Sequence, residues 1–471
     1  MIKPSNGQLN IKAHNPRSRG TVFKISEYFQ TVVLIIVLLT VGLYRGGMVD
    51  MTLPLLMVAA WLILATHVVK QFYVEGHTGT PKQLDARLWF TPWLVISIAC
   101  AIHYFYKMPI VANWLYDLYQ IPLFPYEING YGAEPLGELK RQTRNSWAFF
   151  TVFWVISYSV SQFSVNQIKQ LLWAVVAAGV FQAVVGTYLL QAGSTDVLGL
   201  WTKTSYLGDA TGTFVNRNHY ANFLAICLVI GAGAFMGRTS ILLPKSKLLS
   251  YGLGVSYVML IVAAILSSHS RMGLFVALMA VVVWLIGRET HQRFFKKRRW
   301  VVPLASISLL IIMMLWFGVG ETLQRFLELE DNPDGRWQIW RNLSQLPISA
   351  WIWGVGPGNF ADVYALIKPA NSKHAFSFAH NDYLEFLVEY GVVCVSLFAL
   401  AVAYVVFKLK PKAVLAQRST IWLSALAALL AVALHSVVDF NLRIPANMVL
   451  MAIILGLFMN RHIKTNHRRR L

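Results

Sequence analysis

The sequence predicts an all-α polytopic membrane protein with about 12 transmembrane helices. Hydrophobic residues make up 56% of the 471 residues and charged residues only 13%. Apolar runs recur along the whole chain, and about 20 apolar residues in a helix cross the roughly 30 Å hydrocarbon core of a bilayer. The predicted spans are 28–44, 51–69, 88–106, 147–163, 171–190, 219–236, 249–268, 272–287, 300–318, 383–407, 420–438 and 446–459.

The distribution of charge predicts the orientation of these spans. Most of the 41 Lys and Arg fall in alternate connecting segments, such as "RETHQRFFKKRR" at 288–299, and most of the 21 Asp and Glu fall in the others. By the positive-inside rule, the basic segments 1–27 and 460–471 are cytoplasmic and flank a single transmembrane domain, 28–459. No small-residue cleavage site follows the first span, so we expect no removable signal peptide. The net charge of +20 therefore reports topology, and it does not indicate nucleic-acid binding.

Three long loops are predicted on the outer side, at about 107–146, 191–218 and 319–382. The third, between spans 9 and 10, reads as a small helical cap. "GETLQRFLELE" and "RWQIWRNLSQL" both have apolar residues at helical spacing, and a turn separates them. The chain's three cysteines are isolated from one another, which predicts neither a disulfide framework nor a metal cluster.

Four polar clusters are predicted to meet at the outer membrane face. They are "GTFVNRNHYANF" at 212–223, "SSHSRMG" at 267–273, "FAHNDYLEFLVEYG" at 378–391 and "HSVVDFNLRIP" at 435–445. Arginines at outer helix ends run against the positive-inside bias, which favours a functional role for Arg217, Arg271 and Arg443. A guanidinium can donate two parallel hydrogen bonds to phosphate oxygens, so it is suited to binding a lipid diphosphate. The amides of Asn216 and Asn218 can cap the helix or meet sugar hydroxyls.

The third cluster, at 378–391, combines a histidine with three acids at a helix start. Asp382, Glu385 and Glu389 line one face of the predicted helix, opposite His380. Carboxylates that deep need a partner or a wet cavity, so we expect the acidic side to line a polar cleft rather than face lipid. Asn381 is a good N-cap, and the positive end of the helix dipole beside it favours neutral imidazole at His380, the form a general base needs.

In "HSVVDF", His435 and Asp439 are four residues apart on one predicted helix face, a spacing that permits a His–carboxylate contact. Such a pair could be structural, or it could hold the residues that contact the substrate in place. We include both residues as possible supporting groups.

The four clusters, together with "GVGPGNF" at 354–360, resemble the bacterial O-antigen ligase and polymerase superfamily over about residues 205–459. This resemblance implies a GT-C-like membrane glycosyltransferase in the bacterial inner membrane, with its active site facing the periplasm. It implies a donor glycan on undecaprenyl diphosphate, a hydroxyl acceptor on lipid A–core, a growing polysaccharide or a protein, and no metal, cofactor or nucleotide sugar. It assigns His380 as base and Arg217 and Arg271 as diphosphate ligands. Arg336, in "DGRWQIW", is a further candidate by position.

This chemistry suits the residues. A sugar hydroxyl is a poor nucleophile until a base takes its proton, whereas a lipid diphosphate is already a competent leaving group. One base and cationic stabilisation favour inversion at the anomeric carbon. A retaining route would need a carboxylate nucleophile, which Glu385 or Asp382 could supply.

Two alternatives remain open from the sequence. A polymerase of exopolysaccharide or O-antigen fits the terminal motif as well as a ligase does. A transporter of the lipid-linked oligosaccharide belongs to another class, and it would be expected to show repeats and ionisable groups near the bilayer midplane. Here the ionisable groups cluster at outer helix ends.

Overall fold

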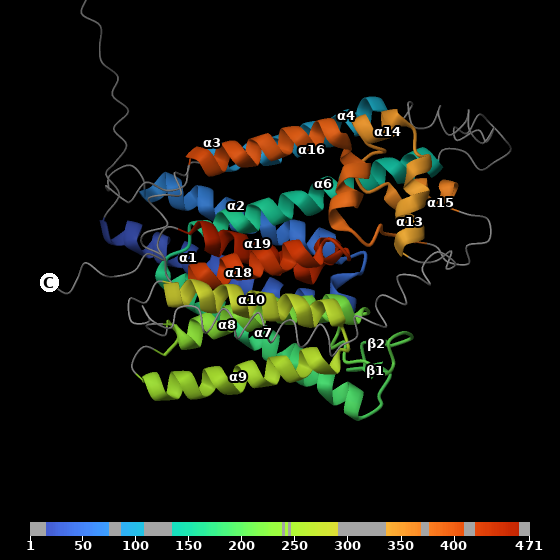
Figure 1. Cartoon of the computed structure of the whole chain (residues 1–471). Helices are drawn as coiled ribbons and strands as arrows, with labels where there is room; N and C mark the ends of the chain where they lie inside the picture. Colours follow the sequence, from blue (N-terminus) through green and yellow to red (C-terminus); the bar gives the residue numbers. More distant parts are fainter. Residues whose placement is uncertain are drawn as a thin grey trace, which may run out of the picture.

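The computed structural model describes residues 16–74, 86–107, 134–237, 241–243, 246–290, 336–368, 376–408 and 420–460, and this part of the chain is mostly helical. The long helices form a bundle (Figure 1). They are α1 (Pro16–Val41), α2 (Thr52–Val74), α4 (Thr91–Ile102), α6 (Glu134–Ser161), α7 (Val165–Gln191), α8 (Arg217–Met236), α9 (Lys247–Ser267), α10 (Arg271–Thr290), α16 (Asp382–Lys408), α18 (Thr420–His435) and α19 (Pro445–Met459). The short helix α3 (Ala86–Trp89) precedes α4.

Each predicted span within the described residues coincides with a helix, and span 300–318 lies outside them. Among the described helices, six are long and apolar enough to cross a membrane, and four more are shorter apolar helices. The predicted loop 107–146 needs correction, because α6 already begins at Glu134. The first turns of α6 are polar, so a search for apolar runs alone does not detect them.

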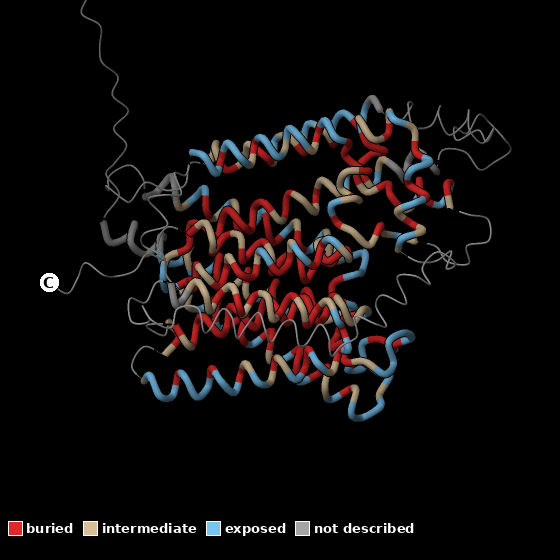
Figure 2. The backbone as a smooth tube through the Cα atoms, in the orientation of Figure 1, coloured by how far each residue is buried: buried red, intermediate tan, exposed pale blue. Residues whose placement is uncertain are grey.

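Burial separates central helices from peripheral ones. Figure 2 shows α8 buried in the middle of the bundle, and α9 and α16 with exposed outer faces. The exposed side chains of the two peripheral helices are largely hydrophobic, among them Leu248, Met259, Leu397, Leu400 and Phe407. Apolar surface of this extent suits contact with lipid chains and not with water, so this is a membrane protein.

Short elements gather at one end of the bundle, which we call the cap end (Figure 1). They are the helices α13 (Arg336–Asn342), α14 (Ile348–Trp353) and α15 (Phe360–Ile367), and an antiparallel hairpin of β1 (Asp196–Val197) and β2 (Trp201–Thr202). The helical cap predicted for "RWQIWRNLSQL" is confirmed, while "GETLQRFLELE" lies outside the described residues.

The loop "GVGPGNF" docks on a break in α16. Gly391 interrupts this helix with φ 74° and ψ 159°, a conformation essentially restricted to glycine. The interruption leaves carbonyls without helical donors, and the loop supplies donors: Val355 N bonds to Val388 O at 2.9 Å, and Gly356 N bonds to Glu389 O at 3.0 Å. The break thereby fixes the cap against the helix that carries the acidic cluster.

We predict that Gly391→Ala destabilises the protein strongly. A Cβ at this position would lie 2.4 Å from Gly354 N, and the backbone strain alone costs about 1–3 kcal/mol. Thermal unfolding of purified protein should show a clearly lower midpoint. The control is Gly252→Ala on α9, where a Cβ meets nothing within 4 Å. Equal midpoints for both variants would contradict a structural role for the break.

Candidate functional site

The four predicted polar clusters come together at the cap end, and hydrogen bonds join them. Ser270 Oγ, just before α10, donates to Asn218 Oδ1 of α8 at 2.8 Å, and Asn218 Nδ2 donates to Asp439 Oδ2 at 2.8 Å. Asp382 N, at the start of α16, donates to Ser436 O at 2.9 Å. The predicted convergence is therefore confirmed.

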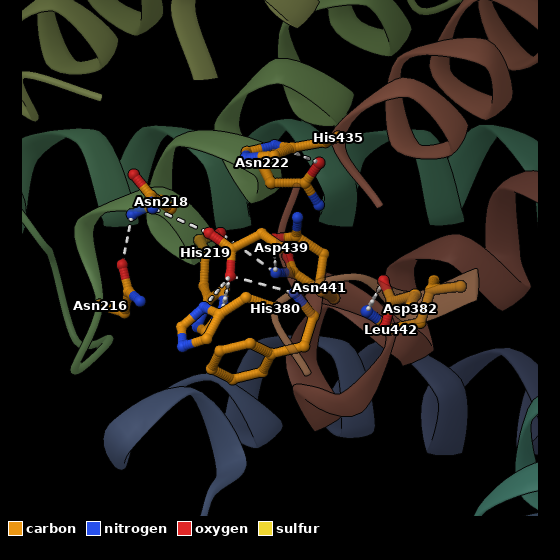
Figure 3. Close-up of polar contacts among 12 residues, drawn as sticks. Asn216, Asn218, His219, Asn222, His380, Asp382, His435, Asp439, Asn441 and Leu442 are labelled. Carbon is orange, nitrogen blue, oxygen red and sulfur yellow. Dashed lines mark hydrogen bonds and ion pairs between the residues drawn. The ribbon is translucent and has the colours of Figure 1, made fainter. Parts of the chain in front are cut away.

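Asp439, between α18 and α19, is the centre of this arrangement, and Figure 3 shows Asn218, His219 and His380 gathered around it. Its carboxylate is fully buried. His219 Nε2 and His380 Nδ1 each lie 3.5 Å from Oδ1, in ion-pair range. Arg336 Nη2 lies 3.5 Å from Oδ2. Phe440 N also donates to Oδ1, at 3.0 Å.

These neighbours decide the ionisation of Asp439. Burial by itself would raise the pKa of this carboxyl, but the imidazoles of His219 and His380 and the guanidinium of Arg336 hold the pKa well below its ordinary value. The group is therefore an anion throughout the physiological range. A buried anion needs this many partners because an unpaired one is very costly.

The Phe440 ring packs the two histidines from the other side. It stacks on Phe378 with centroids 4.2 Å apart, and it meets the rings of His219 and His380 edge-on at 4.5 and 4.9 Å. Apolar packing on one side and a carboxylate on the other leave the imidazoles little freedom to rotate.

His380 is held with one ring nitrogen facing the anion. Its backbone adopts the left-handed conformation, φ 52°, which is uncommon outside glycine and is found at functional sites. Asn381 follows as the predicted N-cap, and its Oδ1 accepts from Tyr383 N and Leu384 N, both at 3.0 Å. A carboxylate only accepts hydrogen bonds, so it favours the tautomer with the proton on Nδ1 and a free electron pair on Nε2. The His380 side chain is 25% exposed, which leaves it accessible to a substrate.

The three candidate diphosphate ligands differ in their surroundings. Arg217 Nη1 pairs with Asp209 Oδ2 at 2.9 Å, and the Arg217 side chain remains 35% exposed. Arg336 keeps a similar exposure beside Asp439. Arg271 is exposed at the first position of α10, just after the connection of three residues between α9 and α10. Asn216 caps α8 through Asn218 N at 2.8 Å, so its role is the capping one.

Among the described residues, Arg443 is the cationic partner of both Glu385 and Glu389. Its Nε lies 2.9 Å from Glu385 Oε1 and its Nη2 lies 2.5 Å from Glu389 Oε2. Both glutamates are only 1% exposed. The expectation that the acidic side avoids lipid is confirmed. However, this side packs against an arginine and does not line a polar cleft, and Arg443 is occupied by carboxylates.

A cavity of about 310 Å³ does lie beside this cluster, but its walls are mostly aromatic. Asp382 and Arg443 form its polar edge, while Phe149, Trp154 and Phe386 are among the apolar lining residues. Asp382 Oδ2 accepts from Leu442 N at 3.2 Å, which ties the start of α16 to the α18–α19 connection.

The predicted contact between His435 and Asp439 is wrong. Helix α18 ends at His435, so the spacing of four residues no longer places the two side chains on one helix face. His435 Nδ1 instead lies 3.2 Å from Asn222 Oδ1 on α8.

Sequence reasoning missed His219 and the acidic partner of Arg217. His219 lies two residues after Arg217 in a helix predicted to enter the membrane, and an ionisable group there is itself a signal. Asp209 and His269 form a second pair, with His269 Nδ1 2.8 Å from Asp209 Oδ1. No helical periodicity relates Asp209, in a loop, to Arg217 eight residues later, and His269 is 60 residues away. The described residues contain no cluster of three or more His, Cys, Asp or Glu suited to a metal ion.

Comparison with known families decides the identity of the domain. Residues 256–399 match the family model described as O-antigen ligase, Wzy_C. This match supports the O-antigen ligase and polymerase superfamily for that part of the chain. The match covers less than a third of the chain and includes Arg271, Arg336 and His380, whereas Arg217 and Asp439 lie outside it. No curated protein matches the sequence. Members of this superfamily are glycosyltransferase-like membrane enzymes, so this O-antigen ligase domain is placed in that class.

We predict that Arg443→Met destabilises the protein by about 3–5 kcal/mol, because two buried carboxylates would lose their cation. Thermal or denaturant unfolding measures the loss. The triple variant Arg443→Met, Glu385→Gln, Glu389→Gln should recover most of it, since neutral amides need no counter-charge. Exposed Arg341 provides a control, Arg341→Met, with little effect. Full stability of Arg443→Met with weaker donor binding would instead make Arg443 a ligand.

Proposed function

We propose that the protein transfers a glycan from undecaprenyl diphosphate to a hydroxyl of lipid A–core on the periplasmic side of the bacterial inner membrane, as a GT-C-like O-antigen ligase. The observation that carries this proposal is the partly exposed His380, with Nδ1 facing the buried Asp439 carboxylate at 3.5 Å. Arginines with exposed surface surround the same place. Glycan transfer from a lipid diphosphate requires a base for the acceptor hydroxyl and nearby cations for the leaving group.

His380 Nε2 is the proposed general base. Because Asp439 favours a proton on Nδ1, Nε2 offers an electron pair to the acceptor hydroxyl. As the hydroxyl loses its proton, its oxygen attacks the anomeric carbon, and the imidazolium that forms is stabilised by the same carboxylate. Such a base contributes ~10²–10⁴-fold to the rate.

The proposed diphosphate ligands are Arg217, Arg271 and Arg336. Guanidinium groups stay protonated and neutralise the charge that grows on the leaving group as the glycosidic bond breaks. Arg217 and Arg336 each use one nitrogen for a carboxylate contact, which holds the side chain in place and leaves other N–H groups for phosphate oxygens. No step of this scheme uses a metal or cofactor.

The surroundings of the α16 carboxylates favour an inverting mechanism over a retaining one. Glu385 is fully buried and its oxygens are engaged by Arg443 Nε and Ala379 N. Asp382 is buried and holds Leu442 N. A retaining nucleophile must reach the anomeric carbon, so neither carboxylate is well placed for it. Product stereochemistry by NMR tests this point, and a retained configuration would contradict the single-base mechanism.

A polymerase of O-antigen or exopolysaccharide would use the same donor and base, and it differs only in the acceptor. A deletion strain separates the readings. Loss of O-antigen from lipopolysaccharide, with polymer accumulating on the lipid carrier, supports the ligase. Single repeat units on the periplasmic carrier indicate a polymerase, and lipid-linked glycan retained on the cytoplasmic side indicates a transporter.

We predict that His380→Asn lowers the transfer rate by ~10²–10⁴-fold while the protein stays folded. Asparagine tolerates the left-handed backbone, and its amide can still donate to Asp439, but it has no base at the Nε2 position. The measurement is transfer from a polyprenyl-diphosphate-linked glycan by purified protein, with donor affinity measured in parallel.

The matched control is His67→Asn. His67 is another buried histidine, on α2, and its ring packs against Tyr158. Its variant should keep normal transfer if it folds. Normal turnover by His380→Asn would remove His380 as the base.

A further inference from the structure

A second Asp–His pair lies at the cap end. His269, in the connection between α9 and α10, places Nδ1 2.8 Å from Asp209 Oδ1, and its side chain is 61% exposed. The His269 backbone is left-handed, φ 50°, like that of His380. Each of the two histidines thus has its own carboxylate facing Nδ1, and both have the same uncommon backbone conformation. They differ in exposure.

The second pair is joined to the first by short connections. Ser270, the residue after His269, donates to Asn218, and Asn218 donates to Asp439. The loop that carries Asp209 is tied to the same place, because Ala210 N donates to Ser267 O at 2.9 Å. Two hydrogen bonds and one peptide link therefore separate the two pairs.

Tyr206 lies in electrostatic range of both carboxylates. Burial raises the pKa of its hydroxyl, and the charges of Asp439 and Asp209 raise it further, while those of Arg217 and Arg336 lower it. The Arg217 guanidinium also lies over the Tyr206 ring, 5.5 Å from its centroid. The carboxylates of both Asp–His pairs and two of the proposed diphosphate ligands therefore lie within electrostatic range of one tyrosine.

The charged groups around His269 favour an anionic ligand there. Asp209 also pairs with Arg217 through Oδ2, and Lys203 Nζ donates to Asp209 O at 2.7 Å. Arg271 follows two residues after His269, at the start of α10. The Asp209 carboxylate thus contacts one arginine and one imidazole, a lysine bonds to the Asp209 backbone carbonyl, and Arg271 is close to His269 in sequence. The basic groups outnumber this carboxylate, which favours a diphosphate here.

We propose that His269 is the general acid of the transfer reaction, delivering a proton from Nε2 to the departing diphosphate. This inference rests on the proposed function. Asp209 holds the proton on Nδ1, so the acid form of His269 is the imidazolium, whose second proton, on Nε2, is the one available to a ligand. His380 acts in the neutral form, with Nε2 unprotonated.

His380 Nε2 takes the acceptor's hydroxyl proton, and the acceptor oxygen forms a bond to the anomeric carbon. The bond from that carbon to the phosphate oxygen breaks, its electron pair goes to the phosphate oxygen, and His269 Nε2 supplies that oxygen with a proton. Each turnover leaves His380 protonated and His269 neutral. Exchange with water restores both, and the exposure of His269 permits it.

The test is the pH dependence of transfer by the purified full-length protein, using a polyprenyl-diphosphate-linked glycan. A base and an acid together give a bell-shaped profile for wild type. In His269→Asn, asparagine fits the left-handed backbone and can still donate to Asp209. We expect kcat to fall ~10²-fold, the alkaline limb to disappear, and the acid limb, KM and thermal midpoint to stay close to wild type. In His269→Gly, added imidazole should restore part of the rate.

Other results overturn the inference and leave the proposed function standing. These are a wild-type rate and profile in His269→Asn, a lower rate with both limbs retained, or loss of the acid limb, which would make His269 the base. A wild-type protein that transfers nothing from a polyprenyl-diphosphate-linked glycan would instead overturn the proposed function together with this inference.

Discussion

The buried carboxylate of Asp439 is the interaction on which the site depends. An anion removed from water must be surrounded by donors and cations, and no single helix can provide them. Here α8 contributes Asn218 and His219, the segment before α16 contributes His380, and α13 contributes Arg336. The requirement to satisfy one charge therefore draws together segments that are more than 200 residues apart in sequence.

A second buried charge group positions the helix that begins beside His380. Arg443 neutralises Glu385 and Glu389, and the break at Gly391 accepts donors from the loop at Gly354–Gly356. Asp382 adds hydrogen bonds between the start of α16 and the α18–α19 connection. The acidic stripe thus serves to anchor the helix, and the imidazole at its N-terminus is the group left accessible.

The sequence allowed the prediction of features that follow from local pattern. Apolar length located the helices, and the Asn381 N-cap, the capped start of α8 and the need of Glu389 for a partner were all found in the structure. The predicted base and diphosphate ligands lie at the common end, and their roles stay predictions. Pairings across the bundle could not be foreseen: Arg443 with two glutamates, His219 with Asp439, and Asp209 with both Arg217 and His269. These contacts depend on which helix ends meet. The one pair inferred from spacing, His435 with Asp439, was local, and it failed because α18 ends at His435.

We infer that Asp439 fixes the tautomer of His380 so that Nε2 can act as base, and ¹⁵N NMR of the imidazole nitrogens can measure that tautomer. The signals can be picked out among the 12 histidines by their loss in His380→Asn. At a pH where the enzyme transfers glycan, we predict a protonated Nδ1 and an unprotonated Nε2 for His380. A proton on Nε2 with Nδ1 bare, or both nitrogens protonated at that pH, would contradict the account.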